Sequence, residues 1–325
     1  MIARTMMSDN FYIVTKNRLD ELPSRSVIAL GTFDGLHIAH REIISEAVAL
    51  AKRAGECQAG AWCFSTIPAR ALGNGSPAYI CSLEERIDRL LSMGLDFVAV
   101  GDFDALRTLP AEDFIGSVLI EKLGCIGTVC GFNHRFGNGG KGNSALLEAA
   151  FGEFSVILPE MKIGDETVSS SAIREHILSG DALGAARLLG RPFSLTAPVV
   201  EGKHLGHSLG FPTANQHFPE SCIVPKYGIY ATVCVTGDGV RRIGVSNVGT
   251  RPTITDGSDS HVTNCETYIH KFGKSIYGET VSIEFCKYLR EERKFGSIKA
   301  LSDQIKLDLA AAIEFFEGEG ASLLS

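Results

Sequence analysis

The feature that most constrains the fold is a change in the pattern of apolar residues near position 190. Before it, strand-like and helix-like segments alternate. Strands are predicted at residues 27–30, 57–64, 96–100, 125–130 and 154–158, and helices at 37–53 and 83–93. Pro110 suits the first position of a further helix that carries Phe114, Val118 and Leu119. This order predicts an α/β domain with a parallel sheet and helices on both faces.

After position 190 the pattern consists of short apolar segments separated by Gly and Pro, such as GIYATVCVTGDG and ETVSIEFCKYL. Such spacing is typical of an antiparallel barrel or sandwich. A helix-like segment at 297–316 closes the chain. We therefore expect two domains, residues 1–187 and residues 188–325.

Composition narrows the classes of function. A net charge of −7 argues against a broadly basic surface for nucleic acid. No apolar run approaches the roughly 18–20 residues of a membrane span, and the first residues lack the apolar core of a secretory signal. The nine cysteines are scattered without a C-x-x-C pair, which is typical of reduced, mostly buried thiols. The sequence thus predicts a cytoplasmic protein with no nucleic-acid or membrane partner.

The stretch SVIALGTFDGLHIAHREII joins a strand, a glycine-containing turn and a helix start. Free backbone N–H groups and the helix dipole favour an anion at such a place. His37 and His40 share one helix face and can donate hydrogen bonds to phosphate oxygens. Two other interpretations stay open: the histidines are structural, or they bind a metal whose third ligand the sequence does not identify.

Two more segments of this half suit a ligand. In VSSSAIREHI, a serine can cap a helix, and Arg174 lies one turn further, within reach of a phosphate held there. An ordinary capped helix is the alternative. The glycine-rich segment GFNHRFGNGGKGNSALL follows a strand and is either a ligand loop or a flexible crossover.

In the second half, EGKHLGHSLGFPTAN carries several glycines and Lys203. Glycines let the backbone approach a ligand closely, and the lysine is compatible with phosphate. Thr213 and Asn215 alternate along an extended segment and so project from one side. Their oxygens suit Mg²⁺. The segment is not a Walker A loop, and the alternative is a glycine-rich hairpin with a proline edge.

These motifs carry a resemblance. Residues 31–40 resemble the H-x-G-H motif of the nucleotidyltransferase superfamily in its flavin version, with Ala39 at the second glycine. Residues 168–174 are similar to I-S-S-T-x-I-R, and residues 131–142 are similar to the family's G-x-[DN]-F-x-F-G segment, with His134 in place of a Phe. The family's P-H-P after its second strand is replaced by FSTIPARAL, which keeps one proline.

The unbroken G-F-P-T-A-N at 210–215 and the segments after it resemble riboflavin kinase, whose fold is a Greek-key barrel. Together the motifs resemble the bifunctional riboflavin kinase/FMN adenylyltransferase family over nearly the whole chain. The resemblance implies that the C-terminal domain phosphorylates riboflavin to FMN and that the N-terminal domain adenylylates FMN to FAD, each with ATP and Mg²⁺. It also implies flavin-dependent apoproteins as recipients of FAD.

The resemblance assigns roles by position. Glu266 becomes the general base of the kinase, although a lone strand glutamate is usually a solvated residue. In the N-terminal domain His37, His40 and Arg174 become catalytic. Substrate-binding residues there are Gly31, Phe33, Asp34, Asn133, Ser170 and Ser171. In the kinase they are Gly202, Lys203, Gly210, Pro212, Thr213, Asn215, Arg290 and Phe295, with Mg²⁺ on Thr213 and Asn215.

Two other functions compete with this prediction. The first is a riboflavin kinase whose N-terminal domain is inactive or altered in specificity, which Ala39 and the replaced P-H-P suggest. The second is a flavin-binding regulator without turnover. The joint presence of Thr213, Asn215, Glu266, His37, His40 and Arg174 argues against the regulator, because a mere binder does not need both sets.

Overall fold

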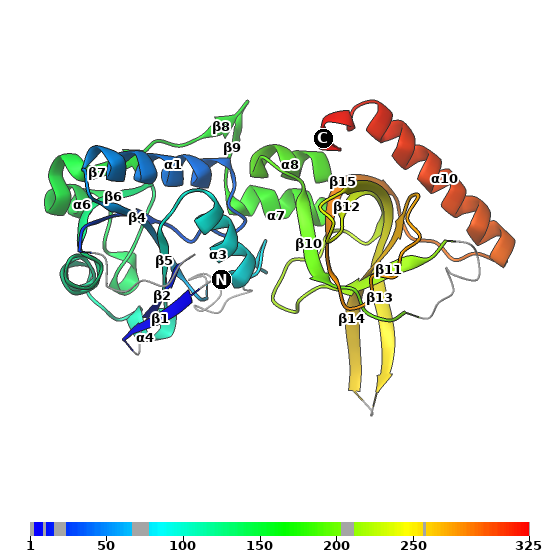
Figure 1. Ribbon diagram of the computed structural model, residues 1–325, viewed down its shortest axis with the longest axis horizontal. Coiled ribbons are helices and arrows are strands. Elements are labelled where there is room, and N and C mark those ends of the chain that lie inside the picture. Colours follow the sequence, from blue (N-terminus) through cyan, green and yellow to red (C-terminus); the bar gives the residue numbers. More distant parts are fainter. Residues whose placement is uncertain are drawn as a thin grey trace. The chain divides into compact units, whose positions relative to one another are not determined.

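A computed structural model describes residues 3–8, 11–15, 24–66, 78–202, 211–255 and 258–324, with only the backbone described at 3–8, 251–255 and 258–262. The chain divides into two compact units, Met1–Ser170 and Ser171–Ser325. Figure 1 shows a mainly α/β unit first and a β-rich unit second. The predicted domain boundary at 187/188 stays a prediction.

The first unit is built on a seven-stranded sheet in the order β1-β2-β5-β4-β3-β6-β7. Its strands are β1 Ala3–Ser8, β2 Phe11–Thr15, β3 Ser26–Leu30, β4 Gln58–Phe64, β5 Phe97–Gly101, β6 Cys125–Gly131 and β7 Ser155–Leu158. The five predicted strands are present and pair in parallel. The prediction missed β1 and β2, which add an antiparallel edge beside β5. Edge hairpins of this kind extend many otherwise parallel sheets.

Both faces of this sheet are covered, as predicted. Val27 and Ala29 of β3 face one apolar cluster, with helices α1 and α3, whereas Ile28 and Leu30 face the other. Pro110, which is predicted at the first position of a helix, is instead the N-cap residue of the short helix that leads into η1. The helices are α1 Ile38–Arg53, α3 Leu83–Ser92, α4 Phe103–Leu106, α5 Ala111–Asp113, the π-helix η1 Phe114–Lys122, η2 Asn138–Gly140, α6 Ser144–Phe151 and η3 Gly152–Phe154; a small hairpin, β8 Lys162–Ile163 and β9 Glu166–Thr167, follows.

The second unit is an antiparallel six-stranded sheet in the order β10-β15-β12-β13-β14-β11. Its strands are β10 Phe193–Pro198, β11 Thr213–His217, β12 Gly228–Val235, β13 Arg241–Thr255, β14 Ser258–Ile269 and β15 Thr280–Arg290. Just past β10, Val200 bridges to Asn215 of β11, so the two edges of the sheet meet and the sheet curls into a barrel. Figure 1 shows this curl and the long β13–β14 ribbon.

Helices complete the second unit: α7 Ser170–Ser179, α8 Ala182–Leu189, α10 Ile298–Glu317 and η4 Ala321–Leu323. The predicted C-terminal helix is confirmed, and the Ser297 side chain caps it by accepting from the Ala300 N–H. Ala312, Phe315 and Phe316 pack on alternate residues of β12, including Ile229 and Val233. The intervening side chains of β12 are left to the barrel interior.

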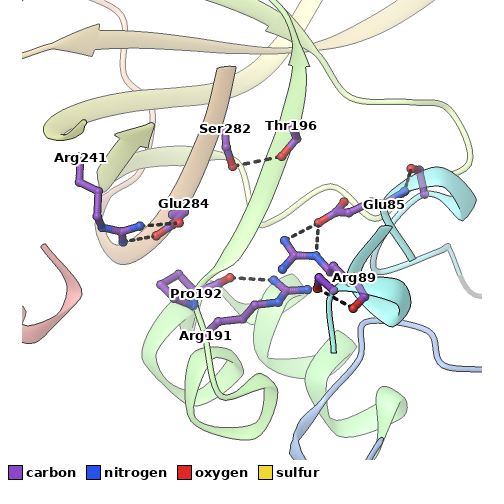
Figure 2. Close-up of polar contacts among 10 residues, drawn as sticks. Glu85, Arg89, Arg191, Pro192, Thr196, Arg241, Ser282 and Glu284 are labelled. Carbon is purple, nitrogen blue, oxygen red and sulfur yellow. Dashed lines mark hydrogen bonds and ion pairs between the residues drawn. The ribbon is translucent and has the colours of Figure 1, made fainter. Parts of the chain in front are cut away.

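Polar contacts fix the barrel wall. The Arg241 guanidinium donates to both carboxylate oxygens of Glu284, at 3.1 and 2.7 Å (Figure 2). It also donates to the carbonyl of Leu323 at 2.7 Å. Thr196 and Ser282 hydrogen-bond across the β10–β15 pair in the same view. Inside, Gln216 is fully buried and donates to two strand carbonyls. These contacts join the C-terminal segment to four strands, β10, β11, β13 and β15.

All nine cysteines are free and seven are buried, which confirms the prediction of reduced thiols. Burial raises the pKa of the Cys130 thiol to about 12, so this thiol stays protonated and poorly reactive at neutral pH.

The centre of the first sheet predicts a stability contrast. A Cβ on Gly60 would overlap the Phe97 ring on the neighbouring strand, whereas Gly116 in η1 has open space. We expect Gly60→Ala to destabilise the unit by about 1–3 kcal/mol, and Gly116→Ala to change stability by about 1 kcal/mol or less. Urea unfolding followed by fluorescence measures this, because the single tryptophan, Trp62, lies buried in this unit. Equal losses in the two variants would contradict this packing.

Candidate functional sites

The turn between β3 and α1 is strained. Phe33, with a φ of 52°, and Leu36, with a φ of 46°, are non-glycine residues in the left-handed region, and Gly35 lies at 81°. A side chain at Gly35 would also press on Ile80, whose Cγ2 lies 2.9 Å from the Cβ position. Such a conformation persists only where its surroundings hold it.

Two contacts hold the middle of this turn. The buried Asp34 accepts a hydrogen bond from the Ile80 N–H at 2.9 Å through Oδ1. Its carbonyl accepts from the Ser170 hydroxyl at 3.0 Å. The predicted ligand residues Phe33 and Asp34 are therefore buried supports of the turn, and their direct contact with substrate stays a prediction.

The turn delivers two histidines as a stacked pair. His37 is the N-cap of α1, and its Nδ1 accepts from the His40 N–H at 3.3 Å. The two rings lie 3.5 Å apart and 15° from parallel, with the Phe33 ring edge-on to His40 at 5.3 Å. Because Nδ1 of His37 accepts a hydrogen bond, its neutral ring carries the proton on Nε2, where it is a donor.

Both histidines are uncharged at neutral pH. Burial lowers the pKa of His37 to about 4. The pKa of His40 lies well below its usual value, first through burial and then through repulsion from His37, when that ring is protonated, and from Arg86. The buried Nδ1 of His40 has no hydrogen-bond partner among the described residues. A pair of this kind supplies neutral hydrogen-bond donors. Two histidines alone are too few ligands for a protein metal site, which usually has at least three. No cluster of three or more His, Cys, Asp or Glu side chains that would suit a metal occurs in the described part of the chain.

The histidines open into a cavity of about 1150 Å³. Trp62, Phe64, Phe103 and Leu106 form an apolar wall, as a planar aromatic ligand requires. Among the predicted site residues, Gly31, Asn133 and Ser170 lie on the lining with His37 and His40. Arg107 and Arg135 are the two basic side chains, Lys or Arg, on the described lining. Burial lowers the pKa of His134 on this lining to about 4, so its ring is neutral.

Ser171 and Arg174 lie on α7, which continues into the second unit. Within α7, Ile173 and Ile177 are buried, and Arg174 is partly exposed between them in sequence. Their predicted contact with the triphosphate stays a prediction.

In the second unit, predicted site residues meet across neighbouring strands. Asn215 of β11 lies opposite Glu266 of β14, which in turn lies opposite Asn247 of β13. Thr213 is two residues before Asn215 and so projects from the same side of β11. The buried Asn264 donates to Glu266 Oε1 at 3.2 Å and to Asn215 Oδ1 at 3.5 Å. The structure thus brings Thr213, Asn215 and Glu266 into one polar cluster.

Gly202 packs directly against the Asn215 amide, where a Cβ would overlap it. The glycine is therefore needed for close approach, as the sequence suggested. Pro212 lies exposed just before β11. Lys203 and Gly210 lie outside the described residues.

Arg290 is already engaged. Its guanidinium donates to both oxygens of Asp308 on α10, at 2.8 and 2.6 Å, and Gln304 donates to the same carboxylate at 2.7 Å. The Phe295 ring lies 5.9 Å from the Arg290 guanidinium and 5.0 Å from that of Arg293. These contacts fasten the segment after β15 to α10, and a riboflavin contact for Arg290 and Phe295 stays a prediction.

Comparison with known proteins agrees with both halves. A family model described as FAD synthetase matches residues 19–172, and one described as riboflavin kinase matches residues 189–316. A Bacillus subtilis relative, the bifunctional riboflavin kinase/FMN adenylyltransferase, is 32% identical over 92% of this chain and 95% of its own. The Escherichia coli K12 protein of the same name is 30% identical over 92% and 96%.

A solved structure from Streptococcus pneumoniae, named a macrolide-efflux protein, has a TM-score of 0.80 and 29% identity, covering 90% of this chain and 95% of that one. In the described part of this chain, no helix has the length and apolarity to cross a membrane.

An α/β nucleotide domain with a histidine-bearing turn, joined to a small antiparallel barrel, defines a two-domain enzyme of flavin nucleotide synthesis. The chain belongs to the bifunctional riboflavin kinase/FMN adenylyltransferase family. Because both family models match, a kinase with a lost or altered N-terminal domain is not favoured.

Several site residues escaped the sequence analysis. Asn247 and Asn264 become visible only through strand register, and Arg107 and Arg135 only through the shape of the cavity. Of the segment FSTIPARAL, which replaces the P-H-P, residues 67–72 lie outside the described residues.

The low pKa of His37 predicts acid sensitivity of the first unit. The unfolded state binds this proton near pH 6.5 and the folded state only near 4, so stability is full above 6.5 and falls as the pH drops toward 4. We expect the free energy of unfolding, followed by Trp62 fluorescence, to fall by about 2 kcal/mol between pH 7 and 5 through His37 alone.

His37→Asn keeps a side-chain acceptor at the N-cap and removes this share of the pH dependence. The matched variant His217→Asn, at an exposed position of β11, keeps the wild-type slope. A His37→Asn slope equal to that of the wild type would contradict the burial of this ring.

Proposed function

We propose that this chain makes FAD from riboflavin in two steps at two separate sites. The second unit transfers the γ-phosphate of ATP to riboflavin, and the first transfers the AMP moiety of a second ATP to the FMN produced. The proposal rests on one observation, the presence of two such sites in one chain. In the first unit, an uncharged histidine pair lies at a helix start beside an apolar cavity. In the second, the barrel places Asn215 opposite Glu266.

In the first unit, an oxygen of the FMN phosphate attacks the α-phosphorus of ATP, and the bond to the β-phosphate breaks to release pyrophosphate. His37 and His40 donate hydrogen bonds to phosphate oxygens as charge builds up in this transition state. Their position at the N-terminus of α1 adds the helix dipole and free N–H groups. The aromatic wall of the cavity suits the flavin ring, and Arg107 and Arg135 suit its anionic partners.

ATP in this unit is held by residues assigned through the family motif. Gly31 leaves room for the nucleotide, with Asn133 and Ser170 on the same cavity. Phe33 and Asp34 support the turn, and Ser171 and Arg174 on α7 hold the triphosphate. Arg174 adds positive charge that stabilises the transition state.

In the second unit, the terminal ribityl hydroxyl of riboflavin attacks the γ-phosphorus of ATP and ADP leaves. Glu266 accepts the hydroxyl proton as general base. Asn264 donates to its Oε1 and fixes the carboxylate. Gly202, Lys203, Gly210 and Pro212 bind the nucleotide, while Arg290 and Phe295 contact riboflavin.

The oxygen donors of the barrel fit Mg²⁺. Thr213 and Asn215 project from one side of β11, and the amide and hydroxyl oxygens are the hard ligands that this ion accepts beside waters and phosphates. The ion would neutralise phosphate charge at both sites. We place the protein in the cytoplasm and propose flavin-dependent apoproteins as recipients of FAD.

Separate substitutions should separate the two activities. His37→Ala with His40→Ala should lower FAD formation from FMN and ATP by on the order of 100-fold or more, while FMN formation from riboflavin stays unchanged. Glu266→Gln should do the reverse, with a loss on the order of 100-fold in FMN formation. Chromatography of riboflavin, FMN and FAD measures both. FAD synthesis that survives loss of both histidines would overturn the assignment.

The contact between Gly202 and Asn215 predicts a kinase defect without loss of the fold. Gly202→Ala displaces the Asn215 amide, so FMN formation should fall about 10-fold or more. Gly237→Ala is the matched control, because its Cβ position lies 3.6 Å from the nearest heavy atom, Oε2 of Glu279, which is ordinary contact. Both variants should keep wild-type FAD formation from supplied FMN. If Gly202→Ala retains full kinase activity, Asn215 does not act at this site.

A further inference from the structure

Arg86 is the one arginine among the largest fully buried side chains of the described chain, with 0% exposure. It lies on α3 with Ile87 and Leu90, which are also buried. Charged side chains are almost never fully buried unless they are paired. Here Nε and Nη2 are buried and have no hydrogen-bond partner among the described residues. Burying a guanidinium with two unpaired nitrogens is energetically unfavourable, which indicates that this arginine has a function.

The remaining nitrogen makes two hydrogen bonds that matter for the site. Arg86 Nη1 donates to the carbonyl of Thr32 at 2.9 Å and to the carbonyl of Phe64 at 3.2 Å. Thr32 lies at the start of the strained turn, and Phe64 is the last residue of β4. Both residues line the cavity. One guanidinium thus joins the backbones of two residues that line the substrate cavity.

The turn needs this contact because its other supports lie on either side of Thr32. The Gly31 N–H donates to the Trp62 carbonyl at 3.4 Å, and Asp34 is held by Ile80 and Ser170, but none of these contacts is made by Thr32. Without Arg86, the Thr32 carbonyl would lose its side-chain partner, and the left-handed Phe33 would be free to relax. His37 follows four residues after Phe33, so relaxation of the turn would move the N-cap of α1.

We propose that Arg86 is a positioning residue of the adenylyl-transfer site, where its guanidinium joins Thr32 to Phe64 and so holds the strained turn that presents His37 and His40 to substrate. This role rests on the proposed function of the first unit. Arg86 does not line the cavity, and it acts through the turn and through its charge.

The charge also acts on the histidine pair. Burial is the main reason why the pKa of His40 lies below its usual value, and His37 from the same helix start and Arg86 from α3 lower this pKa further. On β4, the buried Cys63 has a raised pKa and stays a neutral thiol. Loss of the Arg86 charge therefore allows His40 to take up a proton at higher pH. The acid side of the pH profile of FAD formation should shift upward with it.

The test compares Arg86→Met, Arg86→Lys and the matched control Arg89→Met in the full chain. Arg89 lies one turn along the same helix, is partly exposed and pairs with Glu85 at 2.7 Å (Figure 2). Each variant is assayed for FAD formation from FMN and ATP across pH, for FMN formation from riboflavin, and for unfolding by Trp62 fluorescence. The kinase reports on the integrity of the second unit.

We expect Arg86→Met to lower kcat for FAD formation on the order of 100-fold, because small displacements of positioned groups have losses of this size. Its acid limb should move to higher pH. Arg86→Lys should keep the wild-type limb, because the charge remains, and recover part of kcat. Arg89→Met should match the wild type, and all three should form FMN normally.

Three outcomes overturn the role of Arg86. Arg86→Met turns over FAD within twofold of Arg89→Met; or Arg86→Met loses activity with an unchanged acid limb and no recovery in Arg86→Lys; or both Arg86 variants lose the folded Trp62 signal at the assay temperature, which marks a role in folding alone. A wild-type chain that makes FMN but no FAD overturns the proposed adenylyl transfer, and with it this role.

Discussion

The first site depends on a turn that the backbone alone does not favour. Phe33 and Leu36 hold left-handed conformations between β3 and α1, and His37 caps the helix that follows. Contacts from Ile80 and Ser170 to Asp34, and from Arg86 to Thr32, keep the turn in place. The two imidazoles stack 3.5 Å apart at the start of the helix that follows this turn. Backbone strain of this kind is typical of functional sites.

In the barrel, strand register places the polar cluster, with Asn215 opposite Glu266 and both linked by the Asn264 amide. The bridge from Val200 to Asn215 puts this cluster where the barrel edges meet. A one-residue slip of β11 would turn Thr213 and Asn215 to the other face. The position of this cluster therefore depends on the register with which β11 closes the barrel.

The sequence predicted the architecture because strand-like and helix-like segments alternate before position 190 and short strand-like segments separated by Gly and Pro follow it. It missed β1 and β2, which form an edge hairpin whose pairing is with β5, a distant strand. Motif spacing pointed to His37 and His40, which stack beside the cavity, and to Asn215 and Glu266, which lie opposite each other on neighbouring strands; their roles in the reactions stay predictions. It missed Arg86, although Leu83, Arg86, Ile87 and Leu90 follow helical spacing and place this arginine on the apolar face. Its acidic sequence neighbours are typical of a solvated helix face. Asn247 and Asn264 left no local signal, because register places them.

The central claim is that one chain performs two chemically different transfers in sequence. The most direct measurement incubates the protein with riboflavin, Mg²⁺ and ATP labelled with ³²P at either the α or the γ position, and separates FMN from FAD. The account predicts γ-label in both FMN and FAD, and α-label in FAD alone. If the α-label never enters FAD while γ-labelled FMN accumulates, the N-terminal unit does not transfer AMP and the account of the histidine pair is wrong.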